Sequence, residues 1–287
     1  MSGFALLLVL VAAVSHATWN YFLKKSGGGL GLLTLSAVLA ALWLAPIALW
    51  IALHGSGFHW TFLAMMIGSG LIHTAYFLLL DRAYRSGGDL SVVYPLARAT
   101  GPLLTIVAAT WLLHEHMSVI AVCGALLIGI SAFILTGNPG KLKSAEARRG
   151  IGFALLTGMT IAAYTLWDKQ AVSALMIAPL VFDWGAGFSR VLILIPLTHV
   201  REPGAIARAW REQRKTAIVI GVLSPLSYIL VLTAMVTTPV SYIAPARELS
   251  ILFAALLGAH ALKEGDARRR TIAALGMILG ISGLALG

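Results

Sequence analysis

The sequence predicts an all-α membrane protein with ten transmembrane helices, arranged as two inverted five-helix repeats around a central cavity. Three observations lead to this fold class. The 287 residues are 59% hydrophobic and 11% charged, with a mean hydropathy of +0.89, whereas soluble domains average about 25% charged residues. The apolar residues form ten segments of membrane-spanning length. The two halves of the chain also repeat each other.

A bilayer core requires about 20 apolar residues in a helix. We expect such helices at residues 3–22, 31–53, 61–83, 90–113, 118–137, 151–170, 177–199, 216–236, 240–262 and 270–286. The loops between them are too short for a soluble domain. No basic stretch precedes the first segment, so it is predicted to be a spanning helix and not a cleaved signal peptide.

The basic residues predict how the chain crosses the membrane. The odd-numbered loops hold all but four of the 21 lysines and arginines. The positive-inside rule therefore predicts a multi-pass protein of the cell inner membrane, with these loops in the cytoplasm and both termini outside. The net charge of +10 could indicate a nucleic-acid partner. We expect none, because the basic residues lie in short loops between apolar segments and membrane lipid is the predicted surrounding.

Similar motifs recur in the two halves of the chain. Gly3–Leu7 is repeated as Gly152–Leu156, and Gly129-Ile130-Ser131 as Gly280-Ile281-Ser282. We therefore predict a first repeat at residues 1–137, a cytoplasmic linker at 138–150 and a second repeat at 151–287. An odd number of spans per repeat inverts one copy relative to the other. This is the plan of many secondary transporters, whose binding site lies near the membrane midplane.

The most informative repeat is a stretch of the fourth and ninth predicted helices. Each copy has a serine, a proline four residues later, a charged residue three further on, and an acidic residue at its end. These positions are Ser91, Pro95, Arg98 and Glu115 in the first copy, and Ser241, Pro245, Glu248 and Glu264 in the second. The serine, proline and charge share one helix face. A charge inside a membrane span is by default a functional-site hypothesis.

These features resemble the drug/metabolite transporter superfamily, of the ten-helix type with two EamA-like halves. The resemblance rests on Trp19 and Trp167, on the proline-bearing fourth helix of each half, on the acidic residue after it, and on the glycine-rich last helices. It implies a central cavity lined by helices 1, 3, 4, 6, 8 and 9, and transport of small metabolites or drugs. The chain looks closest to the amino-acid exporter branches.

Arg98 and Glu248 occupy equivalent positions in the two repeats. In one interpretation Arg98 binds an anionic group of the solute and Glu248 binds an ammonium group or a proton. In the other, the two residues form a salt bridge that holds the halves together. Arg247 is an alternative to Glu248, because neighbouring helical residues point about 100° apart.

The other candidate substrate-binding residues are polar and aromatic side chains on the same predicted helices. A tryptophan beside hydrogen-bonding groups suits an amphipathic or cationic ligand, although Trp167 with Asp168 also fits an interfacial aromatic belt. Polar stripes either line a cavity or join helices. The candidates are His16, Trp19, Asn20, His73, Tyr76, Tyr94, Tyr164, Trp167, Asp168, Ser227, Tyr228 and Tyr242.

Prolines within predicted spans each remove one backbone hydrogen bond and create a hinge or a static kink. These candidates are Pro95, Pro102, Pro225 and Pro245. Gly124, Gly129, Gly276, Gly280 and Gly283 predict close packing of the fifth helix against the tenth.

No nucleotide-binding, metal-binding or nucleophile motif is present in the sequence, so we expect neither a cofactor nor a metal nor an enzyme. The single cysteine, Cys123, excludes an intrachain disulfide. The sequence thus predicts a secondary transporter that moves amino acids or similar zwitterions by alternating access, with export favoured. The alternatives are an efflux carrier for lipophilic cations and a non-transporting intramembrane enzyme. A working monomer is expected, because both halves lie in one chain.

Overall fold

The computed structural model describes residues 1–55, 59–85, 90–136, 145–262 and 267–287. Within these ranges the chain is helical and contains no strand. Six helices are long and apolar enough to span a membrane by length and composition. The helices are α1 (Gly3–Lys25), α2 (Leu30–His54), α3 (Trp60–Arg85), α4 (Leu90–Leu112), α5 (Val119–Thr136), α6 (Ala145–Lys169), α7 (Pro179–Arg201), α8 (Ala205–Thr237), α9 (Val240–Ala246), α10 (Leu249–Leu262) and α11 (Ala267–Leu286), and α6 continues into a π-helical segment, η2 (Gln170–Ala174).

The largest differences from the predicted helices occur at three places. The predicted helix at 240–262 is two helices, α9 and α10, separated at Arg247 and Glu248. Residues 205–215, predicted as a loop, form the first turns of α8, with a non-helical backbone at Gln213. Helix α6 begins at Ala145, inside the predicted linker. The predicted starts of α6 and α8 were too late because charged residues were assigned to loops. A helix can project beyond the apolar core of a bilayer, with its polar turns in water.

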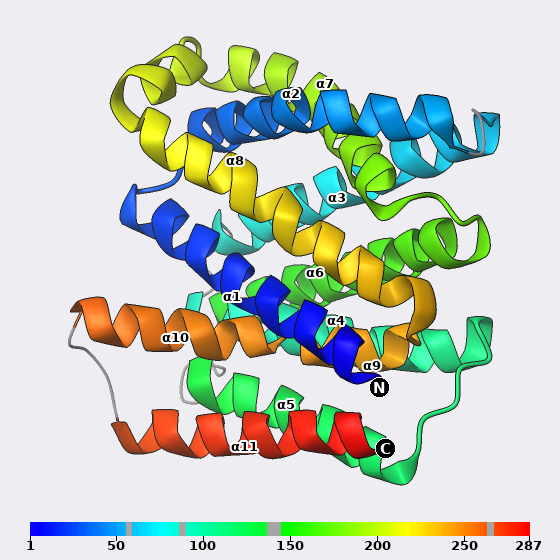
Figure 1. Cartoon of the computed structure of the whole chain (residues 1–287). Helices are drawn as coiled ribbons and strands as arrows, with labels where there is room; N and C mark the ends of the chain where they lie inside the picture. Colours follow the sequence, from blue (N-terminus) through cyan, green and yellow to red (C-terminus); the bar gives the residue numbers. More distant parts are fainter. Residues whose placement is uncertain (56–58, 86–89, 137–144, 263–266) are drawn as a thin grey trace.

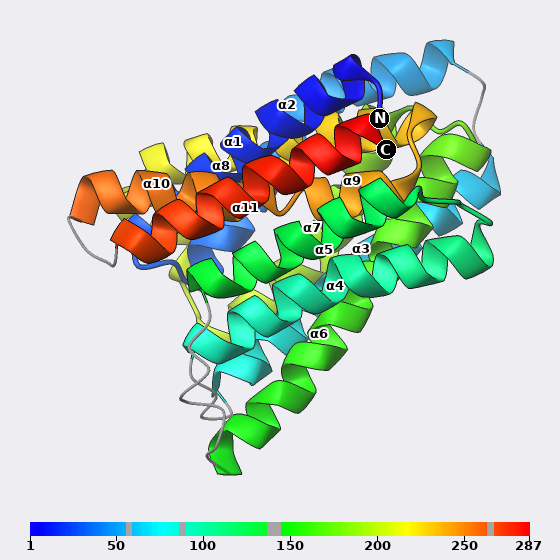
Figure 2. The ribbon, with the colours of Figure 1, turned by 90° about the horizontal axis from the view of Figure 1, so that it is seen from below.

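The helices form one bundle with a helix pair at each edge (Figure 1). Helices α2 and α7 pack together at one edge, and α5 and α11 at the other. Between them, α1 packs against α8 and α10, while α6 packs against α3 and α4. Figure 2 shows the first turns of α6 projecting from the bundle, and both figures place the two chain ends close together.

Many buried positions of the bundle carry small side chains, and many large apolar side chains face outward. The buried positions of α1 include Ala5, Ala12, Ala13 and Ala17, whereas Trp50, Trp60 and Trp111 are among the exposed residues. In a bilayer, apolar side chains gain nothing by facing another helix instead of lipid, so close packing of small residues holds helices together. The outward tryptophans suit a lipid surrounding.

The contact of α5 with α11 is a backbone-to-backbone approach at glycines. A β-carbon at Gly124 would lie 2.5 Å from the carbonyl oxygen of Gly280, and one at Gly283 would lie 3.1 Å from Cα of Gly124. Gly276 faces the Ser131 side chain. For these four glycines the predicted close packing is found. It is wrong for Gly129, whose β-carbon would meet nothing within 4 Å.

Candidate functional site

An ion pair joins the two halves of the chain inside the bundle. Nε of Arg98, on α4, donates to Oε2 of Glu248 at 3.0 Å, and the two side chains are only 13% and 8% exposed. Nη2 of Arg98 also donates to Oγ of Ser250 at 3.1 Å. Of the two interpretations left open by the sequence, this conformation therefore contains the salt bridge.

Glu248 and Arg247 occupy the break between α9 and α10. Pro245 has no N–H to offer the carbonyl of Ser241, so the helix loses a hydrogen bond just before the break. The Arg247 amide still bonds four residues back, to Ile243 at 3.1 Å, but Glu248 bonds three back to Pro245 at 3.1 Å and Ile251 three back to Glu248 at 2.9 Å. The chain thus tightens into a turn that carries two consecutive charges.

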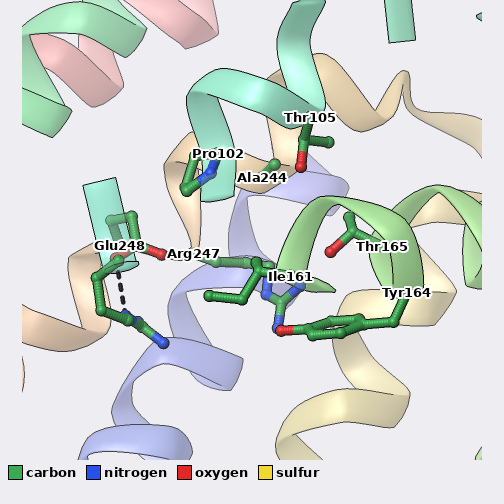
Figure 3. Close-up of a pocket in the computed structure, with 9 residues that line it drawn as sticks. Pro102, Thr105, Ile161, Tyr164, Thr165, Ala244, Arg247 and Glu248 are labelled. Atoms are coloured by element: carbon green, nitrogen blue, oxygen red, sulfur yellow. Dashed lines mark hydrogen bonds and ion pairs between the residues drawn. The ribbon is translucent and has the colours of Figure 1, made fainter. Parts of the chain in front are cut away.

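Two small pockets adjoin these charges, and Arg98 and Arg247 line both. The first pocket is shown in Figure 3, where the dashed line marks the Arg98–Glu248 ion pair. It is lined by Arg98, Pro102, Thr105, Ile161, Tyr164, Thr165, Ala244, Arg247 and Glu248. The second is lined by Ala12, Ala13, His16, Arg98, Ser227, Tyr228, Val231, Arg247 and Ser250. Helices α1, α4, α6, α8, α9 and α10 thus contribute to these pockets.

An aromatic cluster made by His73, Tyr76, Tyr164 and Tyr228 lies beside the pockets. The His73 ring stacks on Tyr164 with centroids 4.0 Å apart and meets Tyr228 edge-on at 5.5 Å. Tyr76 meets Tyr164 edge-on at 6.0 Å. Nδ1 of His73 lies 2.9 Å from the carbonyl oxygen of Ser69. Helix α3 therefore supports the lining tyrosines from behind and does not itself line the two pockets.

Asp168 is fully buried behind Tyr228. The Tyr228 hydroxyl donates to Oδ2 of Asp168, whereas Oδ1 has no hydrogen-bond partner among the described residues. Asp168 lines neither pocket. The predicted alternative of an interfacial carboxylate in water is wrong for this residue, because its exposure is 0%.

The three candidate residues on α1 have different surroundings. His16 lines the second pocket and meets the Trp19 ring edge-on at 5.0 Å. Trp19 packs against the apolar cluster that contains Leu32 and Leu35, and its indole N–H is buried with no acceptor in the described part of the chain. Asn20 donates to the carbonyl of His16 at 2.8 Å. Of these three side chains, only that of His16 reaches a pocket.

Two further candidates lie away from the pockets, and a third is not described. The Trp167 indole donates to the Met65 carbonyl at 2.8 Å and is 37% exposed. A β-carbon at Gly68 would lie 2.6 Å from Cζ2 of the Trp167 ring. The Tyr242 hydroxyl donates to the Gly287 carbonyl at 3.2 Å. The side chain of Tyr94 lies outside the described part of the structure.

The predicted hinge prolines also differ in position. Pro102 lines the first pocket. Pro245 lies directly before the break, and Pro225 is buried inside α8, which continues through it. The side chain of Pro95 lies outside the described part, as does Glu264.

Sequence reasoning missed the lining residues without charge or aromatic rings, such as Ala12, Ala244 and Ser250. It also missed a clamp around the junction of α8 and α9. There Nζ of Lys169 donates to the carbonyls of Met235 and Thr238 at 2.6 and 3.1 Å. Glu115 accepts the N–H groups of Val240 and Ser241 at 2.8 and 2.9 Å. The recurrent acidic residue was the only signal for this clamp.

No group of three or more potential metal ligands occurs among the residues that the structure describes. The pockets instead combine guanidinium, carboxylate, hydroxyl and aromatic groups. Such groups can bind a small organic solute through charge-assisted hydrogen bonds and ring contacts.

Comparison with known proteins gives matches of two kinds. Residues 148–286 match the model of the EamA-like transporter family. A protein of known crystal structure superposes with a TM-score of 0.80 and 16% sequence identity, over 98% of this chain and 97% of that one. At this identity the likeness shows the fold alone. No protein with a curated description matches the chain.

Proposed function

Because residues 148–286 match the model of the EamA-like transporter family, we propose that the chain is a secondary transporter for small organic metabolites carrying a carboxylate, such as amino acids. The family and the apolar helices make it a multi-pass membrane transporter. The substrate class, the inner-membrane location with both termini outside, export as the direction, and alternating access are the parts that we propose.

The observation that carries the substrate class is the Arg98–Glu248 ion pair in the wall of a pocket. Taking two charges out of water costs several kcal/mol per ion, and their mutual attraction repays this only in good geometry. An apolar pair would hold two helices together without that cost. Charged groups in the wall of a pocket can also bind a zwitterion, whose carboxylate and ammonium groups complement a guanidinium and a carboxylate.

The contacts between helices support alternating access of two inverted repeats. Exchanging the halves maps α1 onto α6, α2 onto α7, α3 onto α8, α4 onto the α9–α10 segment, and α5 onto α11. Under this exchange the contact of α1 with α8 becomes that of α6 with α3, and the contact of α1 with α10 becomes that of α6 with α4. A bundle with this pairing can rock one repeat against the other around a fixed central site.

The alternatives fit the pockets less well. A carrier of lipophilic cations needs an available carboxylate, whereas Glu248 is already paired and two arginines surround it. An intramembrane hydrolase needs a hydroxyl directed toward a base. The Ser227 hydroxyl instead donates to the Ser224 carbonyl of its own helix at 2.7 Å.

The test is counterflow uptake of a radiolabelled amino-acid pool by purified protein in liposomes. We expect uptake above empty liposomes, reduced about tenfold or more in an Arg98→Gln/Glu248→Gln double variant. Gly129→Ala, whose new methyl group contacts nothing within 4 Å, is the matched control and should transport normally. Uptake of lipophilic cations in place of amino acids would overturn the proposed substrate class.

A further inference from the structure

Arg247 is a second guanidinium at the site, and its environment differs from that of Arg98. It lines both pockets and lies at the end of α9, directly before Glu248. Its side chain points toward the Tyr164 ring, away from the Glu248 carboxylate (Figure 3). The guanidinium carbon lies 5.3 Å from the centre of the Tyr228 ring. Among the described residues, no acceptor receives a hydrogen bond from this guanidinium.

Arg98, by contrast, already has protein acceptors. Its Nε bonds to Glu248 and its Nη2 to Ser250. A solute that bound Arg98 would have to displace at least one of these contacts. A solute that bound Arg247 would displace none and would supply the acceptors that this guanidinium lacks.

The charges of the lining residues do not cancel. Two guanidinium groups and one carboxylate give the pockets a formal charge of +1 when His16 is neutral. The buried carboxylate of Asp168 is bonded to Tyr228 and lines neither pocket. An unpaired charge inside a membrane is costly and tends to acquire a partner.

We propose that Arg247 is the specificity-determining anchor for the carboxylate of the solute, and that Arg98 is a positioning residue that holds Glu248. A planar guanidinium binds a carboxylate through two parallel hydrogen bonds. The Tyr228 ring lies beside this guanidinium, and Tyr164 lines the first pocket with it. This inference rests on the proposed transport function.

The proposal makes the carboxylate obligatory and the ammonium group dispensable. 2-Oxo acids retain the carboxylate of an amino acid but lack its ammonium group, whereas amino-acid amides lack the carboxylate. We therefore expect a pool of unlabelled 2-oxo acids to inhibit amino-acid counterflow by the wild-type protein, and a matched pool of amides to inhibit it little.

The decisive variant is Arg247→Gln, with the ratio of inhibition by 2-oxo acids to inhibition by amides as the readout. We expect this ratio to fall by about tenfold or more, because a hydrogen-bonded charge contact is lost. Lys169→Gln neutralises another membrane cation, one that bonds backbone carbonyls and lines neither pocket, and should retain the ratio. If Arg247→Gln fails to fold, Arg247→Lys should bind 2-oxo acids more weakly while still excluding amides.

An unchanged ratio in a folded Arg247→Gln protein would overturn the inference while the transport function stood. The inhibition ratio can also be measured in the residual uptake of Arg98→Gln/Glu248→Gln. If the ratio falls in that double variant but not in Arg247→Gln, Arg98 and not Arg247 binds the carboxylate of the solute. Absence of uptake by the wild-type protein, for amino acids and lipophilic cations alike, would instead refute the transport function on which the inference rests.

Discussion

The two copies of the repeated stretch adopt different backbones. In the first half, α4 runs from Leu90 to Leu112 as one helix that includes Arg98. In the second half, α9 ends at Ala246 and α10 begins at Leu249. Both copies have a proline three residues before the charged position, so proline alone does not decide whether the helix continues.

The difference shows how one pattern can serve two roles. The second copy carries two consecutive charges, and the turn between α9 and α10 directs them to different partners. Glu248 reaches Arg98 on the continuous helix, and Arg247 reaches the Tyr228 ring. The continuous helix α4 thus supplies one charge, that of Arg98. The broken α9–α10 segment supplies two charges with different partners. This comparison can be tested at several positions.

The largest effect is expected where the two copies meet. Arg98→Ala removes one partner of a buried ion pair and leaves the Glu248 carboxylate without its cation. This should lower the free energy of unfolding by about 3–5 kcal/mol, measured by denaturation in mixed detergent micelles. The double variant Arg98→Gln/Glu248→Gln removes both charges of the pair, so neither is left without its partner, and should recover most of the loss. Equal instability of the single and double variants would show that the ion pair does not join the copies.

A smaller effect extends the comparison to the last helix of each half, α5 and α11. Gly124→Ala places a methyl group 2.5 Å from the Gly280 carbonyl oxygen. Such overpacking should cost about 1–3 kcal/mol, measured in the same unfolding assay. Gly129→Ala, five residues along the same helix, should be neutral or stabilising by up to about 1 kcal/mol. A similar loss in both variants would mean that helix propensity, and not close approach to α11, determines the result.

The smallest effect concerns the start of the broken copy. Glu115 accepts two N–H groups from the first turn of α9, as an N-cap residue does. Glu115→Ala should therefore destabilise the protein by about 1 kcal/mol, and Glu115→Gln by less, because the amide oxygen still accepts one bond. Glu212→Ala, at an exposed position of α8, is the control. Indistinguishable stabilities for Glu115→Ala and Glu212→Ala would show that the cap does not stabilise α9.

The sequence predicted the site unevenly. It identified Arg98, Glu248, His16, Tyr164 and Tyr228 because polar groups at helical spacing stand out in apolar spans. It grouped Trp19, Asn20 and Trp167 with them because helical spacing specifies a face of a helix but not its neighbour. Trp19 faces the packing of α2 and α8, and Trp167 faces α3. The Asn20 side-chain amide donates a hydrogen bond to the backbone of its own helix.

Hydropathy, chain length and internal repetition by themselves determined that the chain is a helical membrane protein with a duplicated sequence pattern and charges at equivalent positions of its two copies. These properties depend on residue type and spacing. An apolar segment in lipid must form a helix, because its backbone groups can bond only to each other there. Only the tertiary structure decided that α9 and α10 separate, that Arg98 is paired with Glu248, and that Arg247 is left with an aromatic neighbour. These outcomes depend on which helices pack together, and that is a property of the whole bundle.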